Sequence, residues 1–212
     1  MRPDQIVREI LLIFVALFPI VNPLGTAPIF LSLTRDLPAA SRAHLARQVA
    51  FNGFMLLLGA IFIGNYILAF FGISIPVVQV GGGLVVLSTG WKLLQSANDG
   101  EPSRHSAHSL SPDQRAFYPL TLPLTVGPGS ISVAITIGAN RSAGATSLPA
   151  LIIGSLLVAI TIWLSYRFAE NIARAIGSTA MNVILRLSSF ILLCIGVQIL
   201  WNGVAALLKT TH

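Results

Sequence analysis

The chain has 212 residues, of which 54% are hydrophobic and only 9% are charged. A soluble domain carries roughly 25% charged residues, so this composition excludes an ordinary soluble protein and indicates an integral membrane protein. The net charge of +6 would also suit a nucleic-acid binder, but the sequence has no basic stripe with interleaved aromatic residues. Basic loops facing an anionic membrane surface explain the excess, and we expect a lipid bilayer and no nucleic acid as partner.

Five uncharged stretches are long enough to cross a bilayer: residues 10–34, 48–91, 116–140, 142–166 and 187–208. The second has room for two spans, and it divides at the turn residues Gly72, Ser74 and Pro76. We therefore predict an all-α membrane protein with six transmembrane helices. No small-residue cleavage site follows the first stretch, so we expect it to stay in the protein as a permanent span.

The polar segment at residues 97–115 separates a first three-span unit, residues 1–96, from a second, residues 116–212. The loops after spans one, three and five hold eight Lys and Arg residues, and the opposite side holds four. Because basic residues collect in the cytoplasm, we expect residues 97–115 to be cytoplasmic and both termini periplasmic.

The first span of each unit shares a pattern of helix-breaking residues. The segment "FPIVNPLGT" at 18–26 aligns with "LPLTVGPGS" at 122–130 when the numbering is shifted by 104. The segments "GGGLVVLSTGWKLL" at 81–94 and "LSSFILLCIGVQIL" at 187–200 align at a shift of 106. Since each unit has an odd number of spans, the second would lie upside down relative to the first. This predicts an inverted-topology repeat, a common architecture of secondary transporters.

Proline and glycine in the middle of a span predict a broken helix, which is tolerated at membrane depth only inside protein or beside a watery cavity. We expect breaks at residues 22–26 and 126–130, facing each other near the midplane. Backbone groups freed there can hold a solute. The alternative is that these residues only kink the spans. The predicted substrate-binding residues are Asn22, Pro23, Gly25, Thr26, Thr125, Gly127, Gly129 and Ser130.

The six-span pattern, "NPLGTAPIF" in span one and "LPLTVGPGSI" in span four resemble the MarC family of bacterial inner-membrane proteins. The resemblance covers nearly the whole chain. Members with an assigned role are described as transporters of small neutral amino acids such as alanine and glycine. The resemblance therefore implies a transporter or exporter of a small neutral solute in the bacterial inner membrane.

The seven acidic residues all lie in loops or near span ends, which favours a neutral or zwitterionic substrate over an organic cation. Export of drugs or other metabolites is the alternative. We expect no enzyme activity, no catalytic residue and no cofactor or metal, and a coupling ion, Na⁺ or H⁺, stays open, as does the oligomeric state. Arg186 lies in an apolar segment, where it either grips a carboxylate or extends toward the membrane surface.

Overall fold

A computed structural model describes residues 3–99, 115–142 and 146–210, and every regular element in these ranges is helical. The predicted cytoplasmic loop therefore lies almost wholly outside the described residues. The elements, in chain order, are α1 (Pro3–Val21), α2 (Pro23–Leu33), α3 (Ala39–Phe70), α4 (Ile75–Asp99), the π-helical segment η1 (Ala116–Thr125), α6 (Pro128–Ser142), α7 (Leu148–Arg167) and α8 (Ala169–Thr210).

Within the described residues, 5 helical stretches are long and apolar enough to cross a membrane. They are Asp4–Leu33, Ala39–Phe70, Ile75–Gln95, Leu148–Arg167 and Asn182–Lys209. The segments Ala116–Thr125 and Pro128–Asn140 meet at a bend of 72°, and counting them as one span gives 6. The chain is thus an all-helical protein with five or six candidate spans, at the places where the uncharged stretches lie.

Two helices extend beyond the uncharged stretches that predict them. Helix α3 begins at Ala39 and includes Arg42 and Arg47, because arginine is a good helix former and its charge can stay in water beyond the hydrocarbon layer. Helix α8 begins at Ala169 but is interrupted at Gly177, where φ is 76° and ψ is 165°. Only glycine adopts this conformation readily, so the chain turns there before the last span.

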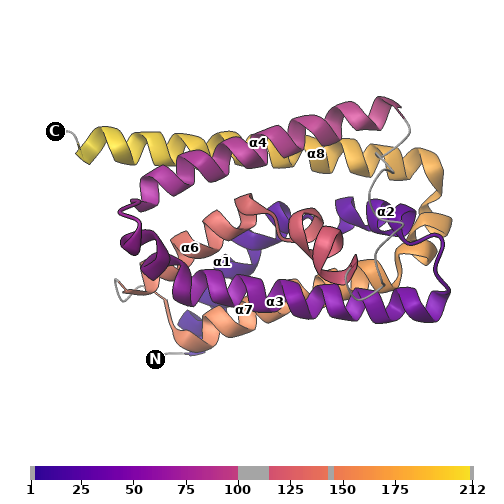
Figure 1. The fold of residues 1–212 in the computed structure, drawn as a ribbon, viewed down its shortest axis with the longest axis horizontal. Coiled ribbons are helices and arrows are strands. Elements are labelled where there is room, and N and C mark those ends of the chain that lie inside the picture. The colour runs from indigo at the N-terminus through magenta and orange to yellow at the C-terminus, as the bar shows by residue number, and fades with distance from the viewer. Residues whose placement is uncertain (1–2, 100–114, 143–145, 211–212) are drawn as a thin grey trace.

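Helices α4 and α8 lie side by side and form a layer above the remaining helices (Figure 1). Their backbones come close because glycine faces leucine across the contact. A Cβ atom at Gly90 would lie 2.7 Å from the backbone nitrogen of Leu193, and one at Gly196 would lie 2.5 Å from that of Leu87. Inside a bilayer no hydrophobic effect drives helices together, because lipid tails are as apolar as the helix surfaces. Membrane helices associate instead through close packing at small residues, as these two do.

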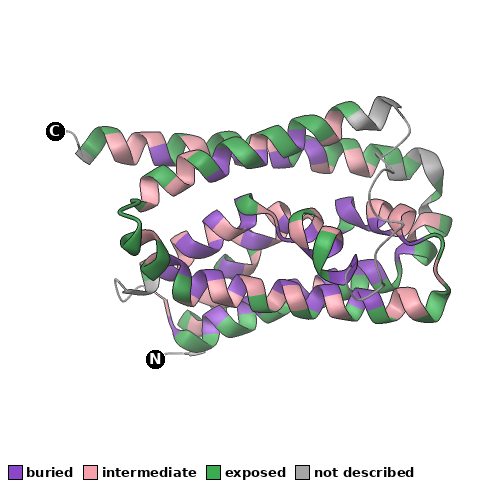
Figure 2. Cartoon of the chain, in the orientation of Figure 1, coloured by how far each residue is buried: buried purple, intermediate pink, exposed green. Residues whose placement is uncertain are grey.

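The second layer holds the main apolar core. The largest fully buried side chains of the core cluster include Leu17, Phe30, Leu57, Leu151 and Ile162. The cluster contains no described residue of α4 and only the first residue of α8, and buried positions accordingly concentrate in the lower layer of Figure 2. Large apolar side chains remain exposed on α3, α4, α7 and α8, as expected for surfaces that face lipid.

Polar contacts join elements at both ends of the molecule. At one end, Arg115 is buried and bonds to Asp36 at 2.8 Å, and Arg42 pairs with Glu170. At the other end, Glu9 of α1 accepts hydrogen bonds from the backbone and side chain of Ser147. Ser147 is the residue before α7, so the Glu9 carboxylate sits at a helix N-terminus, where negative charge is favourable.

Gly138→Ala should destabilise the protein, because the added Cβ would lie 1.9 Å from the backbone oxygen of Ile61 and α3 and α6 would have to separate. Overpacking of this kind costs about 1–3 kcal/mol. Gly59→Ala is the matched control, since nothing lies within 4 Å of its added Cβ. Thermal unfolding in detergent should give a lower Tm for Gly138→Ala and an equal or higher Tm for Gly59→Ala. Equal Tm values for both variants would contradict the packing of α3 against α6.

Candidate functional site

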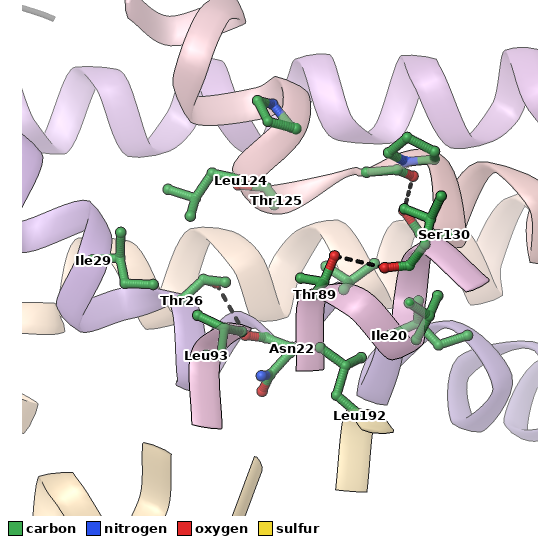
Figure 3. Close-up of a pocket in the computed structure, with 17 residues that line it drawn as sticks. Ile20, Asn22, Thr26, Ile29, Thr89, Leu93, Leu124, Thr125, Ser130 and Leu192 are labelled. Atoms are coloured by element: carbon green, nitrogen blue, oxygen red, sulfur yellow. Dashed lines mark hydrogen bonds between the residues drawn. The ribbon is translucent and has the colours of Figure 1, made fainter. Parts of the chain in front are cut away.

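A cavity of about 430 Å³ lies between the α4–α8 layer and the two Pro/Gly-rich spans (Figure 3). Four segments line it, from span one, α4, span four and α8. Its lining residues are Ile20, Val21, Asn22, Thr26, Ile29, Val85, Val86, Thr89, Leu93, Pro123, Leu124, Thr125, Gly127, Pro128, Gly129, Ser130 and Leu192.

Asn22 separates α1 from α2 and adopts a left-handed conformation, with φ 49° and ψ 54°. Asparagine tolerates this region better than most residues. Its side-chain oxygen accepts the backbone N–H of Gly25 at 3.2 Å, which caps α2. The interruption is shorter than residues 22–26, because the helix resumes at Pro23. Proline is well suited to a first helical position, where its missing N–H costs nothing.

Gly25 makes room for this cap. A Cβ at Gly25 would lie 2.3 Å from the side-chain nitrogen of Asn22, so a larger residue would push the asparagine out of its position. The hydroxyl of Thr26 completes the turn by donating to the backbone oxygen of Asn22 at 3.0 Å. The "NPLGT" motif is therefore a self-capping turn inside an apolar span.

Span four is interrupted more strongly. Segment η1 contains extended residues at Tyr118 and Leu122, and it ends at Thr125. Val126 is extended, with φ −113° and ψ 91°, and α6 starts at Pro128. The Ser130 hydroxyl donates to the backbone oxygen of Gly127 at 2.9 Å. Here too helix resumes within the predicted interval of 126–130, because a proline opens the new helix.

Six of the eight sequence-predicted site residues surround this one cavity: Asn22, Thr26, Thr125, Gly127, Gly129 and Ser130. Pro23 and Gly25 are buried outside its lining. Their place is in the turn that positions Asn22 and Thr26. Arg186 is exposed on α8 and lies outside the lining. The binding roles of these residues stay a prediction.

The polar groups of the cavity can hold opposite charges at different places. Gly129 and Ser130 occupy the first turn of α6, whose N–H groups have no acceptor within the helix and carry partial positive charge. Across the cavity, the oxygens of Asn22 and Thr26 offer acceptors. The remaining lining is mostly aliphatic.

Tyr166 of α7 joins the two interrupted spans. Its hydroxyl donates to Thr26 at 2.9 Å and lies 2.7 Å from the hydroxyl of Thr125. Its ring stacks on Phe30, with centroids 4.4 Å apart. Sequence reasoning missed this residue, and the only available signal was a tyrosine hydroxyl at the end of an apolar run, where it needs a partner once buried.

The α4 contribution was also missed. Val85, Val86, Thr89 and Leu93 line the cavity, and Gly129 must be a glycine because its Cβ would lie 2.0 Å from a methyl carbon of Val86. Nothing in the local sequence marks these four residues, since an aliphatic helix face reads the same toward a cavity and toward lipid.

These features define an integral membrane protein with a cavity built from interrupted helices. The chain belongs to the MarC family, because the family model described as "MarC family integral membrane protein" matches residues 7–208. It is 33% identical over 211 residues to the inner membrane proteins MarC of Escherichia coli O1:K1, O157:H7 and K12, covering 93% of this chain and 95% of each relative. No solved structure matches the chain.

Asn22→Ala should destabilise the protein more than Asn22→Gly. Both variants lose the side-chain cap, whose replacement by alanine costs about 1 kcal/mol and by glycine only a few tenths. Alanine in addition disfavours the positive φ of this position. Chemical or thermal unfolding in detergent should rank wild type first, Asn22→Gly second and Asn22→Ala third. A reversed order of the two variants would argue against the left-handed turn.

Proposed function

We propose that the protein is a secondary transporter or exporter of small neutral amino acids, of alanine or glycine size, in the bacterial inner membrane. The solute binds in the central cavity between the interrupted spans, and the cavity opens to each side of the membrane in turn. The observation that carries the proposal is the cavity itself, which combines two interrupted spans with polar groups of opposite character.

We also infer an inverted repeat, which would support this function. At the shift of 106, Leu87 corresponds to Leu193 and Gly90 to Gly196. This correspondence turns the contact Gly90–Leu193 into the contact Gly196–Leu87. Two contacts related by a two-fold axis have this property. The larger packing pattern exchanges likewise: span four packs on α3 and α4, and span one packs on α7 and α8.

The two turns also correspond. At the shift of 104, Thr26 corresponds to Ser130 and Pro23 to Gly127. Thr26 reaches the backbone oxygen of Pro23 at 3.4 Å, and Ser130 reaches that of Gly127 at 2.9 Å. Related hydroxyls thus bind related carbonyls beside the cavity, which supports a common origin of the two halves and a pseudo-symmetric site.

A zwitterion fits the distribution of these groups. Its carboxylate would bind at the first turn of α6, with the N–H groups of Gly129 and Ser130. The Ser130 hydroxyl would exchange its bond to the Gly127 carbonyl for one to the carboxylate, and that carbonyl would keep the N–H of Ile131. Its ammonium would face the acceptor side, with the oxygens of Asn22 and Thr26. The short aliphatic side chain would meet residues such as Val85 and Leu93.

The lining argues against a bulky or cationic substrate. Among the described residues that line the cavity, none is acidic, aromatic or a methionine. Drug sites are usually lined by aromatic and adaptable side chains, and a cation would need a buried counter-charge. Export of drugs remains the alternative that a flux measurement separates. Coupling to Na⁺ through backbone carbonyls needs no charged side chain, and coupling to H⁺ is the other option.

We further propose the orientation that the basic loops predict, with the termini periplasmic. The contacts Arg115–Asp36 and Arg42–Glu170 gather residues next to spans one, two, four and five at one end. Figure 1 places the beginning of α1 and the end of α8 together at the opposite end. That arrangement supports a single basic face toward the cytoplasm.

Proteoliposomes containing the purified protein should exchange radiolabelled alanine or glycine and should not carry a cationic dye. The physical reason is that the cavity offers partners to both charges of a zwitterion but no carboxylate to a cation. Flux should be measured with and without Na⁺ and pH gradients, and empty liposomes serve as control. Dye transport without alanine or glycine flux would refute the proposed substrate class.

Ser130→Ala should raise the KM for alanine about ten- to thirtyfold, since it removes a hydrogen bond to the carboxylate worth about 1.5–2 kcal/mol. Ser88→Ala on α4 is the matched control, because Ser88 is exposed and outside the cavity lining. Arg186→Ala should change KM less than Ser130→Ala. An unchanged KM in Ser130→Ala, with normal KM in the control, would remove the Ser130 hydroxyl from the site.

A further inference from the structure

A second cavity, of about 180 Å³, lies at the end of the molecule where Arg42 pairs with Glu170. It is more polar than the central cavity and is formed by the end of α2, the start of α3, the end of α7 and the start of α8. Its lining includes Phe30, Leu31, Arg42, Tyr166, Glu170 and Arg174.

Tyr166 and Phe30 stand between the two cavities. Both line the second cavity, and the Tyr166 hydroxyl contacts Thr26 and Thr125, which line the central one. The two rings stack within 12° of parallel, and their exposed fractions are 0% for Phe30 and 2% for Tyr166. A pair of flat, buried rings therefore separates the central cavity from a polar cavity near the surface.

We propose that the Phe30–Tyr166 pair is a gate, and that the second cavity is the passage through which a small zwitterionic solute travels between the central cavity and that side of the membrane. The proposal rests on the proposed function for the identity of the solute. The position of the gate rests only on the two cavities and the residues between them.

The hydrogen bonds around Tyr166 allow it to leave without stranding a buried donor. Each hydroxyl has one proton to donate. In the closed arrangement Thr125 can donate to Tyr166, Tyr166 to Thr26, and Thr26 to the backbone oxygen of Asn22. When Tyr166 moves away, Thr125 can donate to the backbone oxygen of Leu120 at 2.6 Å. Thr26 continues to donate to the backbone oxygen of Asn22. The two interrupted spans thus stay satisfied in both arrangements.

The second cavity suits a zwitterion in transit. Glu170 offers a carboxylate to an ammonium group, while Arg42 and Arg174 offer cations to a carboxylate. The Arg42 and Glu170 side chains are 18% and 49% exposed, so their pairing is partly solvated and weak enough to exchange with a passing solute. The closed gate and an open passage would then differ by the placement of two rings and one ion pair.

Cysteine labelling tests the gate without any transport substrate. The chain has a single cysteine, Cys194, so Cys194→Ser gives a cysteine-free background. Thr89→Cys then reports on the central cavity and Ala43→Cys on the second one, because each residue lines only that cavity. A membrane-impermeant thiol reagent is applied to membrane vesicles of each orientation, and the rate of modification is measured from each side.

From the side on which Ala43→Cys reacts, Thr89→Cys should react slowly. If the open arrangement is the minor state, at most about 10% of molecules occupy it at any time. Adding Phe30→Ala, which removes one ring of the gate, should therefore raise the modification rate at least about tenfold. Tyr166→Phe, which keeps the rings but removes the hydroxyl, should raise it less. Leu31→Ala is the matched control, as Leu31 lines the second cavity without stacking on Tyr166, and it should leave the rate unchanged.

Equal rates from that side in the parent, Phe30→Ala and Tyr166→Phe proteins would overturn the gate. So would rapid modification in the parent, or an equal increase in Leu31→Ala. If Phe30→Ala lowers the Tm too far to be measured, Tyr166→Phe alone decides. Because the labelling requires no amino acid, a failure of alanine flux with a successful labelling result would refute the proposed substrate and leave the gate standing.

Discussion

The interior of a bilayer supplies no hydrogen-bond partner to the backbone, and this constraint governs the whole structure. An interrupted span is stable there only when its own side chains or its neighbours satisfy the freed groups. In this chain Asn22 caps α2 with its side chain, and the hydroxyls of Thr26 and Ser130 return to carbonyls of their own turns. Thr125 has the backbone oxygen of Leu120 within reach as a second acceptor. Backbone hydrogen bonding thus accounts first for the polar residues of the two motifs. A solute must therefore use the remaining groups or replace one of these bonds.

The two turns, with their backbone groups hydrogen-bonded, also affect how the helices pack. Span one is interrupted at Asn22 and span four bends by 72°. The α4–α8 layer covers both spans, and a cavity lies between. Glycines set the closeness of that cover: Gly82 faces Ser132 and Gly129 faces Val86. The Ser132 hydroxyl further donates to the backbone oxygen of Val78 at 2.9 Å, which ties α6 to α4. The layer that closes the cavity is therefore joined to the core layer by a few small-residue contacts and not by the main apolar cluster.

Long uncharged stretches, proline and glycine are local signals, and they predicted what is local: the spans and the positions of the two turns. Pro23 and Gly25 were placed in the cavity because a sequence shows that a turn exists but not which of its residues point inward. Tyr166, Val86 and Thr89 were missed for a related reason. Their roles depend on helices that are far apart in the chain, and Thr89 on an aliphatic helix gives the same pattern whether it faces lipid, protein or a cavity. The narrower interruptions follow from proline, which ends one helix and begins the next.

The hydroxyl link through Tyr166 belongs to one end of the molecule. It joins Thr26 of span one to Thr125 of span four, at the end where Arg42 pairs with Glu170 and lines the second cavity. The passage proposed at this end can open only when that link breaks, whereas its formation holds the two interrupted spans together. A solute can shift this balance only by binding the open and the closed arrangement with different affinity. The arrangement described here, with the rings stacked and the hydroxyls joined, is the one that the link favours.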